Sequence, residues 1–106
     1  MIKAVIIDDE KTAREFVELI LKRNFPNVKI CGTANSVVEG IKLVNNNKPD
    51  IVFLDIEMQD GTGFDLLEAI PEKQFDFIFV TAYDHYAIKA FKYSAVDRKS
   101  TRLNSS

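Results

Sequence analysis

Short, continuous apolar runs alternate with helical patterns along most of this chain, and this alternation constrains the fold more than any other feature. Three of the runs are rich in valine, isoleucine and phenylalanine, a pattern typical of strands buried on both faces of a parallel sheet. These runs are residues 3–7, 51–54 and 77–80. A fourth stretch, residues 28–34, alternates instead and places Val28, Ile30 and Gly32 on one side. That alternation predicts a half-exposed strand at the edge of the sheet.

The segments between and after the runs repeat apolar residues at the spacing of amphipathic helices. The first helix is expected over residues 12–24, and the second follows Asn35 or Ser36, either of which can cap a helix. Pro71 ends the third helix, and Asp84 can cap a fourth. The four apolar stripes are Ala13, Phe16, Val17, Ile20 and Leu21; Val37, Ile41 and Val44; Phe64, Leu67 and Ile70; and Tyr86, Ala87, Ala90 and Phe91.

Strict alternation of strands and helices predicts an α/β fold of the doubly wound type, with a parallel sheet, helices on both faces and right-handed crossovers. An edge-like second strand beside buried first, third and fourth strands favours the strand order 2-1-3-4-5. Sheets of this type bind ligands beyond the carboxyl ends of their strands, where the strand order reverses. The candidate functional residues are therefore the polar residues that directly follow the strands.

Polar residues follow three of the predicted strands at this edge. Asp8 and Asp9 follow the first strand, while Asp55 follows the third and Thr81 the fourth. Because neighbouring strands lie about 4.8 Å apart, the three carboxylates are expected to converge in one pocket. Their repulsion requires protonation or a cation, and carboxylate and carbonyl oxygens suit Mg²⁺. A carboxylate beside Mg²⁺ can attack phosphorus to give an aspartyl phosphate, and a hydroxyl such as Thr81 can donate to a phosphoryl oxygen.

Each of these residues also has a purely structural interpretation. Asp9 or Glu10 can simply cap the first helix. Asp55 alone can be an ordinary loop acid, and Thr81 alone can terminate a strand. Asp60 is expected to be a turn residue, with the glycines beside it supplying permissive backbone. The coincidence of three acids and a hydroxyl at the ends of three neighbouring strands favours a phospho-acceptor site.

Composition excludes several other classes of protein. The apolar fraction of 46% is enough for a packed core, which argues against a disordered chain. The net charge of −2 argues against nucleic-acid or anionic-membrane binding by this domain itself. The single cysteine, Cys31, allows neither an internal disulfide nor a metal–thiolate site. Because no run approaches a membrane span or a signal peptide, a cytoplasmic protein is expected.

Three stretches of the chain resemble the receiver domain of two-component response regulators, namely AVIIDDE, PDIVFLDIEMQDGTGFDLL and FIFVTAYDHYAIKAFKYSAVD. The resemblance covers residues 2–97 and implies a flavodoxin- or CheY-like fold. The stretch TAYDHYAIKAF resembles, more narrowly, receivers that precede a LytTR-type DNA-binding domain. The resemblance implies a phosphorylation-switched signalling module, which catalyses only its own phosphoryl transfer and dephosphorylation.

The resemblance also implies roles for individual residues of the pocket. Asp55 would accept a phosphoryl group from a sensor histidine kinase or a small phosphodonor. Asp9 and Asp55 would bind Mg²⁺ directly, together with the backbone carbonyl of Glu57. Asp8 would contribute through a water molecule.

The same resemblance implies how the phosphoryl group would be detected. The Thr81 hydroxyl and the backbone N–H of Ala82 would bond the phosphoryl group. The added charge, about −1.5 to −2, would bias a two-state surface that controls an output domain or receiver homodimerisation. The expected partners are a sensor histidine kinase and, through an output domain that this chain lacks, DNA. No membrane partner is expected.

The receiver pattern stops near Val96. We therefore expect an incomplete receiver domain over residues 1–96 and a non-native or disordered tail over residues 97–106. Most of the fifth strand and fifth helix would be missing, and Arg98 and Thr101 would occupy the positions of the family's switch aromatic and phosphoryl-contacting lysine. The tail DRKSTRLNSS resembles a translated sequencing-library adapter. Such a chain is expected to be unstable or to self-associate, and a sharp monomeric thermal transition would contradict this.

Three other functions are compatible with a fold of this type. A Mg²⁺-dependent phosphatase with an aspartyl-phosphate intermediate usually carries D-x-D after its first strand, whereas Asp8 and Asp9 are adjacent. A phosphorylation-independent interaction domain would be expected to lose pocket acids that this chain keeps. A flavin binder needs a hydroxyl-rich phosphate loop, whereas DDEKTA would repel a phosphate. Turnover of phosphate esters would distinguish the phosphatase from the signalling module.

Overall fold

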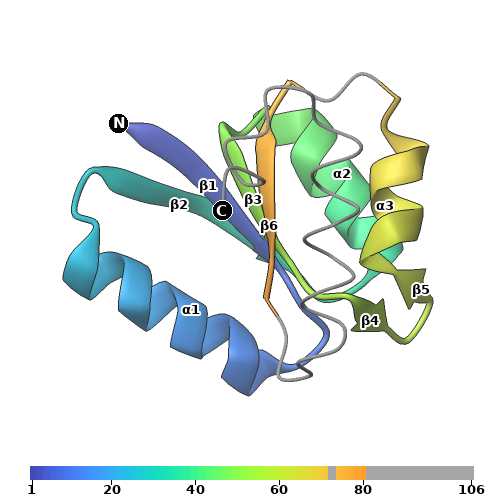
Figure 1. Ribbon diagram of the computed structural model, residues 1–106, viewed down its shortest axis with the longest axis horizontal. Coiled ribbons are helices and arrows are strands. Elements are labelled where there is room, and N and C mark those ends of the chain that lie inside the picture. The colour runs from blue at the N-terminus through green and yellow to red at the C-terminus, as the bar shows by residue number, and fades with distance from the viewer. Residues whose placement is uncertain (72–73, 81–106) are drawn as a thin grey trace, which may run out of the picture.

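The computed structural model describes residues 1–71 and 74–80 (Figure 1). Its strands and helices alternate as predicted, and a short two-stranded hairpin follows the third strand. The elements are β1 (Ile2–Ile7), α1 (Lys11–Asn24), β2 (Val28–Ala34), α2 (Val37–Asn47), β3 (Ile51–Leu54), β4 (Glu57–Met58), β5 (Gly61–Thr62), α3 (Gly63–Ala69) and β6 (Asp76–Phe79). The predictions for the fourth helix, the fifth strand and helix, and the tail lie outside the described residues.

Four parallel strands form the main sheet in the order β2-β1-β3-β6. Since β6 is the predicted fourth strand, this confirms the predicted order for the first four strands. The pairing places Ile7 of β1 opposite Leu54 of β3, and Leu54 opposite Phe79 of β6. The carboxyl ends of these three strands therefore finish side by side at one edge of the sheet.

Helices cover both faces of the sheet, as the doubly wound fold requires. In Figure 1, α1 lies on one face, and α2 and α3 lie on the other. The larger core cluster lies between the sheet and α2 and α3, and it includes Val5, Ile7, Val52, Leu54, Leu66, Leu67 and Phe77. A smaller cluster on the α1 side contains Ile6, Val17 and Leu21.

Burial along β6 is one-sided, which corrects the prediction that this strand is buried on both faces. Phe77 is completely buried in the larger cluster, whereas the next residue, Ile78, is 37% exposed. The reason lies in the position of α1, which packs on β1 and β2. Among the described elements, α1 is the only helix on that face, so it covers less of the sheet there than α2 and α3 cover on the other face.

A β-bulge in β2 corrects a second prediction. The ladder with β1 skips Cys31, which is an extra residue between two paired positions. Val28 and Ile30 pack with the cluster on the α1 side. Beyond the bulge Gly32 faces α2, where an added Cβ would lie 2.8 Å from the Leu43 side chain. The prediction that Val28, Ile30 and Gly32 share one side is therefore wrong, because the bulge reverses the alternation.

The helix starts show which capping predictions hold. Ser36 is the N-cap of α2, and its hydroxyl accepts the Glu39 N–H at 3.1 Å. Thr62 caps α3 in a reciprocal capping box with Asp65, which the sequence analysis did not anticipate. α1 begins after Glu10 without a side-chain cap. Two of the three helices in the described part of the chain are thus fixed at their start by side-chain hydrogen bonds.

Candidate functional site

Asp8 and Asp55 open the loops that follow two adjacent parallel strands. The residues immediately before them, Ile7 and Leu54, are paired in the sheet. The Asp55 N–H extends this pairing by donating to the Ile7 carbonyl at 2.9 Å, and the Asp8 N–H donates to the Ala34 carbonyl at 3.0 Å. Backbone hydrogen bonds across β2, β1 and β3 therefore place both acids.

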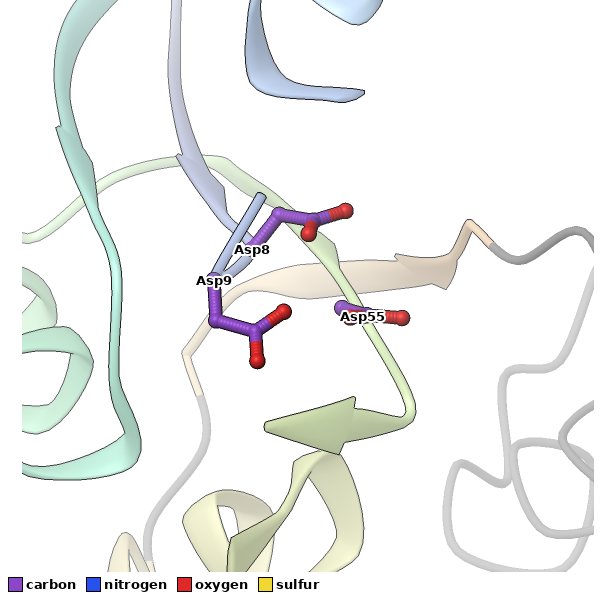
Figure 2. A group of neighbouring side chains, drawn as sticks. All are labelled: Asp8, Asp9 and Asp55. Atoms are coloured by element: carbon purple, nitrogen blue, oxygen red, sulfur yellow. The ribbon is translucent and has the colours of Figure 1, made fainter. Parts of the chain in front are cut away.

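Three carboxylates meet at this edge of the sheet. Asp8, Asp9 and Asp55 each bring an oxygen to within 4.8 Å of the others (Figure 2). Asp8 is only 6% exposed, while Asp9 and Asp55 are half-buried. The structure thus brings together the three acids whose convergence the strand order predicts.

Neither acid at the start of α1 caps that helix. Glu10 occupies the N-cap position, but its side chain makes no capping hydrogen bond. Its backbone N–H donates to the Asp8 carboxylate at 2.9 Å, and the Arg14 guanidinium donates to the Asp8 carbonyl at 2.7 Å. The capping interpretation of Asp9 and Glu10 is therefore wrong. Arg14 was missed by the sequence analysis, because nothing in its helical spacing indicates a contact with the loop.

The turn after β3 holds Asp55 from the other side. The Ile56 N–H donates to the Asp55 carboxylate at 2.8 Å, and the Gly63 N–H donates to the Ile56 carbonyl at 2.8 Å. A Cβ at Gly63 would lie 2.5 Å from the Asp55 carbonyl oxygen, so a side chain there would force the backbone to shift. Gly63 is therefore required for the close approach of α3 to the backbone of the acid.

Burial and mutual repulsion alter the acidity of the cluster. Burial, followed by the negative charge of Asp8, raises the pKa of Asp55 to about 7. Burial also raises the pKa of Asp8, against the lowering effect of the Glu10 N–H and with a further increase from the charge of Asp9. Without a cation, one proton or an unrelieved repulsion must therefore remain in the cluster near neutral pH.

The donor set of the cluster fits a hard divalent cation. All three members are carboxylates, and their oxygens lie close enough together for one ion to contact more than one of them. Oxygen-only sites select Mg²⁺, Ca²⁺ or Mn²⁺ over metals that prefer nitrogen and sulfur. A cation here would also offset the repulsion that raises the pKa of Asp8 and Asp55.

The remaining residues that the sequence analysis singled out are not members of the acid cluster. Glu57 lies two residues after Asp55, at the start of β4, on the loop that leaves the acid cluster. Thr81 and Ala82 lie outside the described residues. Asp60 lies in the turn between β4 and β5, as predicted, but its carboxylate also reaches α2, a contact that the sequence analysis missed.

The family pattern of the response regulator receiver domain matches residues 4–99. The chain belongs to this receiver family. Receivers are signalling domains that interact with histidine kinases and with output domains, and the family generally binds Mg²⁺. The resemblance in the sequence is thereby confirmed at the level of the family.

Two curated relatives and one solved structure illustrate the similarity of this receiver. It is 41% identical over 98 residues to the transcriptional regulatory protein BtsR of Escherichia coli K12, covering 92% of this chain and 41% of that protein. It is 38% identical over 99 residues to the sensory transduction protein LytT of Bacillus anthracis, covering 92% and 40%. Its fold matches the response regulator domain of Thermotoga maritima CheB with a TM-score of 0.74 at 27% identity, over 91% of this chain and 75% of that one.

The receiver spans about two fifths of the length of the curated relatives that it matches. The activities of those longer proteins are therefore not assigned to this chain by similarity alone. Across residues 1–71 and 74–80, no helix is long and apolar enough to cross a membrane.

Proposed function

We propose that this receiver is phosphorylated on Asp55 in a Mg²⁺-dependent reaction and regulates an output domain. The observation that carries the proposal is the convergence of Asp8, Asp9 and Asp55 at the carboxyl edge of the sheet, in a chain of the receiver family. The raised pKa of Asp55 supports it, because the burial and repulsion that raise it are relieved when a cation binds among the three acids.

In this proposal the protein mainly positions charge around the acceptor. A Mg²⁺ ion bound by Asp9, Asp55 and the Glu57 carbonyl, with Asp8 acting through water, would supply positive charge for the phosphoryl oxygens. An Asp55 carboxylate oxygen forms the bond to phosphorus as the bond from phosphorus to the donor breaks. The Ile56 N–H, which donates to the Asp55 carboxylate, holds that side chain in place during the attack.

The response to phosphorylation is also part of the proposal. Thr81 and the Ala82 N–H would bond the phosphoryl group, and the new charge would bias the surface that contacts the output domain or a second receiver. The donor would be a sensor histidine kinase. The name of BtsR, a transcriptional regulatory protein, supports a transcriptional output. The similarity to LytT, a sensory transduction protein, supports a signalling role, and we infer a LytTR-type DNA-binding domain in a cytoplasmic protein.

Phosphorylation by acetyl phosphate tests the proposal directly. The chain is incubated with acetyl phosphate and Mg²⁺ and its intact mass is measured. We expect a gain of one phosphoryl group in the wild type and none in Asp55→Asn. Asp50→Asn is the matched control, because Asp50 lies at the opposite end of β3 and accepts the Lys3 N–H at 2.8 Å. This control should keep the mass gain.

Two outcomes would contradict the proposal. A mass gain that persists in Asp55→Asn would place the phosphoryl group elsewhere. Steady release of phosphate from simple esters, without a stable adduct, would indicate the phosphatase alternative instead.

A further inference from the structure

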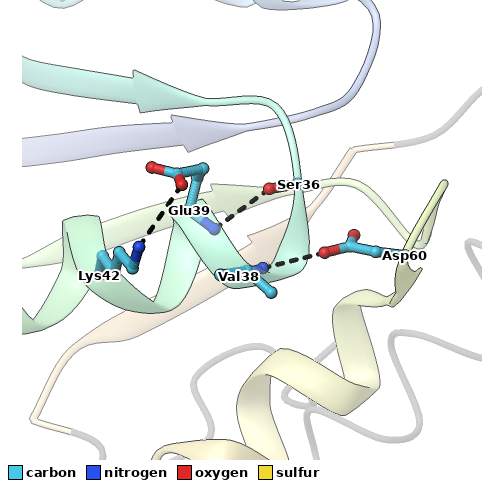
Figure 3. Close-up of polar contacts among 5 residues, drawn as sticks. All are labelled: Ser36, Val38, Glu39, Lys42 and Asp60. Atoms are coloured by element: carbon cyan, nitrogen blue, oxygen red, sulfur yellow. Dashed lines mark hydrogen bonds and ion pairs between the residues drawn. The ribbon is translucent and has the colours of Figure 1, made fainter.

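The β4–β5 hairpin is attached to the start of α2 by one side chain. The Asp60 carboxylate, in the turn of the hairpin, accepts the N–H of Val37 at 2.8 Å. It also accepts the N–H of Val38 at 3.1 Å (Figure 3). These are the first two residues of α2, and their N–H groups have no partner within the helix. An element close to the acid cluster is thus joined to a helix that lies far from it in the sequence.

The two caps of α2 divide its free N–H groups between them. Ser36 accepts the Glu39 N–H through its hydroxyl, while Asp60 accepts those of Val37 and Val38. Figure 3 shows the two side chains approaching the same helix end from different segments of the chain. The Ser36 cap is local to the helix, whereas the Asp60 cap connects the helix to the hairpin.

The hairpin is packed against α2 at a second point. A Cβ at Gly61 would lie 3.3 Å from Val37 and 2.9 Å from the Asp65 carboxylate, so β5 runs close to both helices. The φ of Gly61 is 151°, which a residue with a side chain rarely adopts. The backbone of the hairpin is therefore shaped for this close contact, and the Asp60 hydrogen bonds hold it there.

The same hairpin carries Glu57. Only Met58 and Gln59 separate Glu57 from Asp60, and Ile56 alone separates Glu57 from Asp55. The segment is anchored at its other end by the Gly63 N–H, which donates to the Ile56 carbonyl at 2.8 Å. A shift of the turn would thus be transmitted to the Glu57 backbone within a few residues.

We propose that Asp60 is a positioning residue for the metal site, which holds the Glu57 carbonyl in place by fastening the hairpin to the start of α2. This inference rests on the proposed function, because it assumes that Glu57 is a ligand. Asp60 is exposed, and the N–H groups of Val37 and Val38 lower the pKa of its carboxyl group, so the carboxylate that makes the attachment stays charged at neutral pH.

The first test needs no metal. We compare amide hydrogen exchange by NMR in the wild type, Asp60→Ala and Ser36→Ala at neutral pH. Both variants remove a cap from α2, and circular dichroism checks that both are folded. If Asp60 fastens the hairpin, exchange at residues 57–62 rises in Asp60→Ala but not in Ser36→Ala, while both show faster exchange at the start of α2.

The second test measures the metal site itself. We expect Asp60→Ala to raise the Mg²⁺ dissociation constant about tenfold, the lower range for loss of a group that supports a ligand. Ser36→Ala should bind Mg²⁺ as the wild type does. Asp60→Asn, which keeps one oxygen able to accept an N–H, should fall between them. At saturating Mg²⁺ the acetyl phosphate reaction of Asp60→Ala should recover, because Asp60 acts on the metal and not on phosphorus.

The outcomes separate this inference from the proposed function. If the wild type neither binds Mg²⁺ nor gains a phosphoryl group, the proposed function fails and this inference with it. If the wild type does both, and Asp60→Ala and Ser36→Ala show equal Mg²⁺ affinities, Asp60 is only a helix cap and this inference alone is overturned. A rate for Asp60→Ala that saturating Mg²⁺ does not restore would also overturn it.

Discussion

A proton and a bound cation would compete for the same oxygens at Asp8, Asp9 and Asp55. The three side chains lie within 4.8 Å of one another, and burial with the charge of Asp8 raises the pKa of Asp55 to about 7. A carboxyl group with that pKa holds its proton below neutral pH unless a cation replaces it.

Binding of Mg²⁺ should therefore strengthen as the pH rises. With a pKa of about 7 at Asp55, we expect the affinity to fall by up to about tenfold for each pH unit below neutrality, since a proton must leave. Above that pKa the carboxyl group has already lost its proton, so the affinity should no longer change with pH. Calorimetric titration across this pH range measures it, and Asp55→Asn should bind more weakly with a flatter profile. An affinity that does not change between mildly acidic and mildly alkaline buffer would contradict the prediction.

The metal-free chain should become more stable when the Asp55 charge is removed. The pKa of Asp55 is raised in the folded state, so the folded state binds its proton more tightly than the unfolded chain does. The resulting stabilisation is complete below the ordinary carboxyl pKa and is lost as the pH rises through about 7. Asp55→Asn should thus melt higher than the wild type at mildly alkaline pH, and the difference should shrink on acidification. Thermal melts with a chelator measure it, and the opposite trend with pH would refute the assignment.

At the level of elements, the close packing of α3 against the β3 turn shapes the acid cluster. Gly63 begins α3, and a Cβ there would meet the Asp55 carbonyl oxygen at 2.5 Å and the Phe79 ring at 2.9 Å. A second glycine, Gly32 of β2, is also closely packed, because a Cβ there would lie 2.8 Å from the flexible end of the Leu43 side chain. One contact involves rigid backbone and the other a movable side chain, which allows a controlled comparison.

Alanine at these two glycines should have unequal effects. Gly63→Ala should lower the free energy of unfolding by about 1–3 kcal/mol through overpacking, although alanine is the better helix former. Gly32→Ala should lower it less, because the Leu43 side chain can move. Urea denaturation of both variants gives the values. Equal losses, or unchanged Mg²⁺ binding in a folded Gly63→Ala, would argue against a backbone clash at the acid.

The sequence predicted those features that depend on local pattern or on strand order. The bounds of β3 and the Ser36 cap follow from a few adjacent residues, and the meeting of Asp8 with Asp55 follows from the pairing of neighbouring strands. The bulge at Cys31 and the contact of Asp60 with α2 did not follow. Both depend on how separate elements pack. The two residues whose N–H groups donate to Asp60, Val37 and Val38, lie 23 and 22 positions before it in the sequence.

The whole sheet is asymmetric in how its two faces are covered. The α2–α3 side holds the large cluster that contains Phe77, whose ring also packs edge-on against Phe79 with centroids 5.8 Å apart. On the α1 side the cluster is smaller, and Ile78 and Phe16 are 37% and 62% exposed. Most of the apolar stabilisation of the described part of the chain therefore comes from one face.

Substitutions at adjacent residues of β6 should reveal this asymmetry. Phe77→Ala should lower the free energy of unfolding by about 3–5 kcal/mol, because it empties a completely buried site. Ile78→Ala should lower it by less than about 1.5 kcal/mol, because its side chain is 37% exposed. Urea denaturation measures both. Similar values for the two variants would mean that the α1 side is as well packed as the other.

The parallel pairing of β1 with β3 determines when the acid cluster can form during synthesis and folding of the chain. A ribosome delivers Asp8 and Asp9 first, and it must synthesise α1, β2 and α2 before it reaches Asp55. Contacts between such distant segments form late, because the intervening chain must first be closed into a loop. The acid cluster therefore does not exist in a partly made chain, and its three carboxylates meet only after the centre of the sheet has assembled.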